Sequence, residues 1–194
     1  MINNEKSERV RLHFAETARR MILSSGIEEF SARKLAVEAG YSLGTIYNHF
    51  SSLDEVLWYT RSLMIEVMGK YLTEKSTSSS DSIDNLKLLF KNYLSYFIEH
   101  PQVYRFLYFH KLDKSEKTVT SLADSPDFSK QRMKIFTSLI NNGKLSQKDA
   151  ATILTTIIYS IQGILTMVIT DNDNVDKKTA FNQLEEIIDF LTKK

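Results

Sequence analysis

The chain has 194 residues, 42% of them hydrophobic, and 25 Lys and Arg against 24 Asp and Glu, a formal net charge of +1. This length and apolar content fit one large domain or two small ones with a real core, and they exclude a largely disordered chain. The lack of cysteine excludes disulfides, thiolate zinc ligands and thiol catalysis. The polar opening segment MINNEKSERVR leads us to expect no secretory signal.

The spacing of the apolar residues predicts an all-α chain of about nine helices. No segment shows the sustained apolar–polar alternation of a strand, and Pro and Gly are few. The first helix is expected over about residues 5–25, where Phe14, Ala18, Met21 and Ile22 form one apolar stripe.

Two short helices are expected next, over residues 32–39 and 43–49. Ser31 and Ser42 precede them as N-caps, because their hydroxyls can accept hydrogen bonds from the first free amides of a helix. Gly40 ends the first of the two, since a residue past a helix end often needs a positive φ.

The remaining helices are longer, and two polar connections separate some of them. Their expected ranges are about 52–72, 83–100, 101–110, 126–142, 146–170 and 176–191. The Ser-rich segment 73–82 predicts a flexible connection, and residues 111–125 are expected to be mostly loop. We expect one domain over residues 1–51, extending into the fourth helix to about residue 67, and a second over residues 52–194.

The helix expected to end at residue 170 contains the apolar run ATILTTIIYSIQGILTMVIT, which is long enough to cross a membrane. Five Thr, one Ser and the central Gln162 argue against a membrane span. A helix that is apolar on most faces also suits a buried interface, and this is the interpretation we adopt.

Residues 31–50, SARKLAVEAGYSLGTIYNHF, have the organisation of a helix-turn-helix motif, whose second helix enters the major groove of DNA. Leu35, Ala36 and Ala39 of its first helix can meet Ile46 and Phe50 of its second. Short polar or flat side chains remain outside on the second helix, and such groups can contact bases and phosphates. The alternative is a structural helix pair whose outer polar side chains are merely solvated.

The segment over residues 9–57 resembles the N-terminal DNA-binding domain of the TetR/AcrR family of transcription regulators. The resemblance is carried by Ala15, Ala18, Gly26, Phe30-Ser31-Ala32-Arg33, Leu35-Ala36, Ala39-Gly40, Ser42, Gly44-Thr45-Ile46-Tyr47 and His49-Phe50. It implies a dimer that places two copies of the third helix in successive major grooves of operator DNA. It also implies a C-terminal domain in which a bound ligand changes the spacing of the two reading helices.

The resemblance assigns DNA contacts to one set of residues. They are Arg33, Ser42, Leu43, Gly44, Thr45, Tyr47, Asn48 and His49. Two positions depart from the family pattern. Tyr41 replaces an aliphatic residue and is expected to pack against the first helix, although it could also reach the phosphate side; Leu53 replaces a frequent phosphate-binding Lys. Lys34 and the amides near Ser51 and Ser52 could compensate for that lost contact.

Two further sets of candidate residues belong to the C-terminal part and its neighbours. Aromatic and Met side chains with a few polar groups suggest an effector pocket, although ordinary core packing is the alternative. The pocket candidates are Trp58, Met64, Met68, Tyr93, Tyr96, Phe97, Phe106, His110, Tyr159 and Gln162. The candidates for a dimer interface in the last two helices are Ile157, Ile161, Gly163, Ile164, Leu184, Ile187 and Ile188.

The sequence therefore favours a cytoplasmic, homodimeric DNA-binding regulator, a repressor released from its operator by an apolar or aromatic small molecule. We expect no catalytic residues, no metal, no cofactor and no membrane partner, because the four His are scattered and no nucleophile or phosphate-loop motif occurs. The alternatives are a protein of the same fold that binds other proteins instead of DNA, and a small all-α enzyme.

Overall fold

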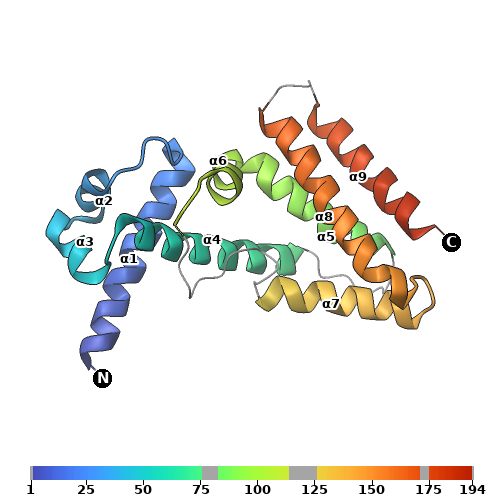
Figure 1. Cartoon of the computed structure of the whole chain (residues 1–194), viewed down its shortest axis with the longest axis horizontal. Helices are drawn as coiled ribbons and strands as arrows, with labels where there is room; N and C mark the ends of the chain where they lie inside the picture. Colours follow the sequence, from blue (N-terminus) through green and yellow to red (C-terminus); the bar gives the residue numbers. More distant parts are fainter. Residues whose placement is uncertain (1, 76–82, 114–125, 171–174, 194) are drawn as a thin grey trace. The chain divides into compact units, whose positions relative to one another are not determined.

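The computed structural model describes residues 2–75, 83–113, 126–170 and 175–193, and these residues form helices and their connections without any strand (Figure 1). The α-helices are α1 (Ile2–Ser25), α2 (Ala32–Ala39), α3 (Leu43–His49), α4 (Leu53–Lys75), α5 (Ile83–Glu99), α6 (Pro101–Tyr104), α7 (Pro126–Asn141), α8 (Gln147–Thr170) and α9 (Lys177–Thr192). The predicted all-α fold is confirmed.

Two expected ranges are wrong in part. The predicted connection over 73–82 starts too early, because α4 continues to Lys75; the rest of that connection, residues 76–82, lies outside the described residues. Residues 114–125 of the predicted loop also lie outside the described residues. The helix expected over 101–110 is α-helical over its first turn and then widens into a π-helical turn, η1 (Arg105–Phe109).

Two hydrogen bonds characterise the π-helical turn. The His110 N–H donates to the Arg105 carbonyl, five residues back, at 3.1 Å. The Leu107 carbonyl inside the turn accepts a hydrogen bond from the Arg61 guanidinium of α4. A five-residue turn of this kind leaves no periodic signal in the sequence, so hydrophobic spacing could not predict it.

The chain divides into two compact units, and α4 passes from one to the other at Val67. The first unit contains Met1–Val67 and His100–Leu122. Its core joins α1, α2, α3 and the start of α4. The buried core residues are Phe14, Ala18, Leu35, Ala36, Ala39, Ile46, Phe50 and Val56. The predicted contact between the two helices of the motif is therefore confirmed, and the small Ala residues let their backbones approach closely.

The second unit contains Met68–Glu99 and Ala123–Lys194, with α8 and α9 side by side (Figure 1) and α5 packed against both. Ile157, Ile161, Leu184 and Ile188 are at most 1% exposed in its core. By length and composition α8 could cross a membrane, which is weak evidence because the core helix of a soluble protein passes the same test. Two large apolar side chains of α8 remain exposed, Tyr159 by 72% and Met167 by 44%.

Candidate nucleic-acid interface

The turn between α2 and α3 is built by local hydrogen bonds. Gly40 has a φ of 73°, and its N–H donates back to α2, which ends that helix. The Tyr41 N–H also donates back, to the Ala36 carbonyl at 2.9 Å. The hydroxyls of Ser31 and Ser42 accept hydrogen bonds from the amides of Lys34 and Thr45, at 3.3 and 3.2 Å. The two N-caps and the glycine stop predicted from the sequence are confirmed.

Helix α3 has one buried side and one exposed side. Ile46 is fully buried, and Phe50, directly after the helix, is 2% exposed. The exposed residues at and along the helix are Ser42, Leu43, Gly44, Tyr47 and Asn48, all predicted to contact DNA. Thr45 is half-buried, and its hydroxyl lies 2.9 Å from the Ser42 hydroxyl. The geometry therefore presents a short row of polar and flat groups on a supported helix.

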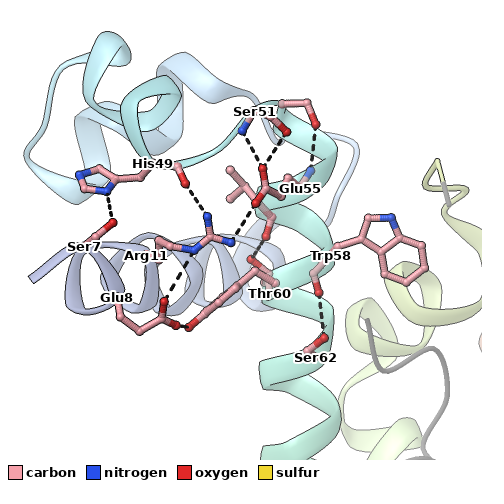
Figure 2. A network of polar contacts seen from close by, with 12 residues as sticks. Ser7, Glu8, Arg11, His49, Ser51, Glu55, Trp58, Thr60 and Ser62 are labelled. Atoms are coloured by element: carbon pink, nitrogen blue, oxygen red, sulfur yellow. Dashed lines mark hydrogen bonds and ion pairs between the residues drawn. The ribbon is translucent and has the colours of Figure 1, made fainter. Parts of the chain in front are cut away.

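The end of α3 is held by side chains that the sequence did not single out (Figure 2). Arg11 of α1 donates to the His49 carbonyl at 2.5 Å and to the Glu55 carboxylate of α4 at 2.9 Å. The His49 ring, predicted to lie on the DNA, is half-buried, and its Nδ1 lies 2.9 Å from the Ser7 hydroxyl. Ser7 and Arg11 are four residues apart and share a face of α1, but nothing in their spacing points to α3 or α4.

Two ionisable groups near Arg11, Glu55 and Tyr59, have pKa values that differ from their ordinary values. Burial alone would raise the pKa of Glu55, but hydrogen bonds from the Ser51 N–H and hydroxyl and from Arg11 hold that pKa below its ordinary value. Burial, and then the hydrogen bond that Tyr59 donates to Glu8, raise the pKa of Tyr59 to about 12. Glu55 therefore stays ionised and Tyr59 stays neutral at physiological pH.

The departures from the family pattern can now be placed. Tyr41 packs against α1, with its ring centroid 5.3 Å from that of Phe14, as expected. Lys34 pairs with Glu29 at 2.8 Å, and the Ser51 amide donates to Glu55. Two of the groups expected to replace the missing contact at position 53, Lys34 and the Ser51 amide, thus already have partners. Arg33 is exposed at the start of α2.

The predicted pocket residues fall in both units. In the second unit, Gln162 donates to the Tyr93 hydroxyl at 2.9 Å, and the Tyr93 ring lies 5.0 Å from that of Phe97. Tyr96 and Met68 are buried in the same unit, whereas Tyr159 lies on the exposed face of α8. Trp58, Met64, Phe106 and His110 belong to the first unit. A hollow of about 620 Å³ in the first unit, between α1 and α2, is lined by none of the predicted pocket residues.

The predicted interface residues also divide into two groups. Ile157, Ile161, Ile164, Leu184 and Ile188 are enclosed by their own protomer. Ile187 is half-buried and Gly163 is exposed. The large apolar side chains that stay exposed on α8 and α9 are Tyr159, Met167 and Phe190, which the sequence did not single out as interface residues.

Comparisons with known proteins agree with this geometry. Residues 15–57 match the family model of bacterial regulatory proteins of the tetR family. Over 59 residues the chain is 44% identical to the HTH-type transcriptional regulator PksA of Bacillus subtilis (strain 168), a match that spans 30% of this chain and 29% of PksA.

Similar solved structures extend the likeness in fold over the whole chain. RolR, solved in complex with resorcinol, has a TM-score of 0.67 and 16% identity, covering 98% of this chain and 96% of that one. A TetR family transcription regulator from Marinobacter aquaeolei VT8 has a TM-score of 0.66 and 14% identity, covering 97% of each chain. Residues 15–57 therefore match the DNA-binding motif of the tetR family, and the chain as a whole shares its all-α fold with these solved structures.

Proposed function

We propose that the protein is a sequence-specific DNA-binding transcription regulator whose reading element is α3. The observation that carries the proposal is that one side of this helix is buried and the other side is exposed. Ile46 fixes α3 on the core of the first unit while Tyr47 and Asn48 stay exposed beside it. Asn can pair with the edge of adenine, and Tyr can donate to a phosphate, so this side of α3 suits the major groove.

The charge distribution supports binding through few phosphate contacts. Residues 1–50 contain seven Lys and Arg and six Glu, so this part of the chain is nearly neutral. Arg11 and Lys34 are also engaged with carboxylates. The affinity for DNA should accordingly be modest, and it should fall only shallowly with added salt, because the slope follows the number of neutralised phosphates.

We further propose a cytoplasmic homodimer that acts as a repressor and leaves its operator when an aromatic effector binds. RolR, whose fold is similar, was solved with resorcinol. In the second unit of this chain, Tyr93 and Gln162 place a polar pair beside the Phe97 ring, a combination that suits an aromatic ligand carrying a hydroxyl. The exposed apolar side chains on α8 and α9 support a second copy of the chain as partner.

The DNA assignment is tested by replacing Tyr47 and Asn48 together with Ala. Each base contact contributes about 1–3 kcal/mol of discrimination, so the double variant should lose sequence-specific binding while its thermal stability stays close to that of the wild type. The measurement is a gel shift with the DNA upstream of the protein's own gene. Val37→Ala, 77% exposed on the neighbouring α2, is the control and should bind as the wild type does. Full specificity in the double variant would contradict the assignment of α3.

A further inference from the structure

One arginine outside the helix-turn-helix motif connects three helices of the first unit. Arg11 projects from α1, and its side chain is 22% exposed. It donates to the carbonyl of His49, the last residue of α3, and to the carboxylate of Glu55, in the first turn of α4. Its Cζ also lies 4.3 Å from the centroid of the Phe50 ring. Phe50 lies in the short segment between α3 and α4. Figure 2 shows the His49 carbonyl and the Glu55 carboxylate beside the guanidinium of Arg11.

Helix α3 is short enough to need such an anchor. It has seven residues, and the last carbonyls of any α-helix lack partners within the helix. An isolated helix of this length is not stable in water, so contacts with neighbouring elements decide its direction. Ile46 supplies one contact and Ser42 caps the first turn, whereas Arg11 and Ser7 hold the last residue from α1.

The contacts of Arg11 leave it little capacity to bind DNA directly. Its two terminal nitrogens donate to His49 and Glu55, and its Nε lies 3.9 Å from the Glu8 carboxylate. Glu55 in turn accepts hydrogen bonds from the Ser51 N–H and hydroxyl, at 2.6 and 2.7 Å. These bonds hold the short segment between α3 and α4. All three nitrogens of the guanidinium thus lie near partners within the protein.

From this geometry we propose that Arg11 is a positioning residue for DNA reading: it orients α3 on α4 so that Tyr47 and Asn48 meet the base edges, and does not itself contact DNA. The inference rests on the proposed function of α3. Because the fork of Arg reaches a carbonyl and a carboxylate at once, Lys cannot replace it, although Lys keeps the charge.

The test compares full-length variants on two DNA duplexes. One duplex is enriched by the wild-type protein from a random-sequence library, and the other is a scrambled duplex of the same length and composition. Arg11→Met should bind the enriched duplex about tenfold more weakly and the scrambled duplex nearly as well as the wild type. Arg11→Lys should not restore the selectivity. Arg9→Met removes a charge from an exposed position on the same helix and should leave the selectivity unchanged.

Salt dependence separates positioning from direct contact. A lost phosphate contact lowers the slope of log affinity against log salt by about one, whereas a positioning residue leaves the slope unchanged. A lower slope in Arg11→Met, equal losses on both duplexes, or wild-type selectivity would each overturn the assignment. If Arg11→Met fails to fold, Glu55→Gln carries the test, because it removes the ionised partner of Arg11 and should lower selectivity in the same direction.

A measurement without DNA keeps the inference distinct from the proposed function. Amide hydrogen exchange in α3 of the free protein should be several-fold faster in Arg11→Met than in the wild type, while exchange in α2 stays the same. If the wild type enriches no sequence, the proposed function fails. If it enriches one but α3 exchanges at an unchanged rate in Arg11→Met, the positioning role fails.

Discussion

At the scale of single residues, Glu55 concentrates several stabilising interactions on one partly buried carboxylate. It accepts hydrogen bonds from Arg11 and twice from Ser51, and it lies in the first turn of α4, where the helix dipole favours negative charge. These donors outweigh the burial that would otherwise raise its pKa. The carboxylate therefore contributes to the stability of the first unit while it is ionised.

This balance predicts a pH-dependent effect of Glu55→Gln. Because the pKa of Glu55 in the folded chain is below its ordinary value of 4.5, the stabilisation is present above that value and is lost as the pH falls through the folded pKa. At neutral pH the variant should be less stable by about 1–3 kcal/mol, the usual effect of losing hydrogen bonds to a charged group. Urea unfolding from about pH 7 to pH 3 measures the difference, which should shrink in acid.

The control for this titration is Glu16→Gln. Glu16 is exposed on α1 and makes no hydrogen bond or ion pair within the described part of the chain. Its replacement should leave the stability nearly unchanged at every pH. A Glu55→Gln deficit that stays constant down to acid pH would contradict the assigned role of the ionised carboxylate.

At the scale of elements, local signals were enough to predict most helices but not their partners. Ser31, Gly40 and Ser42 mark the ends of α2 and α3 because caps and positive φ depend on neighbouring residues in the chain. The contact of Arg11 with His49 and Glu55 joins positions 38 and 44 residues apart, which no periodicity encodes. For the same reason the sequence could place His49 on α3 but could not indicate that the Ser7 hydroxyl hydrogen-bonds with its ring nitrogen.

The turn between α2 and α3 gives a contrast between two neighbouring glycines. A Cβ on Gly40 would meet no described atom within 4 Å, but the φ of 73° is unfavourable for any residue with a Cβ. Gly40→Ala should therefore cost about 1–2 kcal/mol of stability. Gly44→Ala should be neutral or stabilising, since Gly44 is helical and has only Ser42 Oγ nearby, at 3.7 Å. Thermal unfolding of both variants checks this, and equal losses would contradict it.

At the scale of the whole molecule, α8 carries large apolar side chains on both its buried and its exposed side. The inner side packs within the second unit through Ile157 and Ile161, which explains why the sequence marked them. Hydrophobicity alone could not indicate which apolar side faces its own protomer, because both sides share the helical period. The outer side carries Tyr159 and Met167, which are 72% and 44% exposed, four residues on either side of Gly163.

Gly163 provides the sharpest test of the proposed homodimer. A Cβ there would meet no described atom within 4 Å, so packing within the protomer does not require glycine, although glycine inside a helix costs about 0.5–1 kcal/mol relative to Ala. Close approach of a second copy would account for it. Gly163→Leu should leave the protomer folded but weaken dimerisation and operator binding together, because two half-sites need two linked reading helices. Sedimentation equilibrium gives the dimer dissociation constant, and Thr137→Leu, exposed on α7, adds similar bulk as the control. An unchanged dissociation constant would remove this face of α8 from the interface, and a monomeric wild type would contradict the homodimer itself.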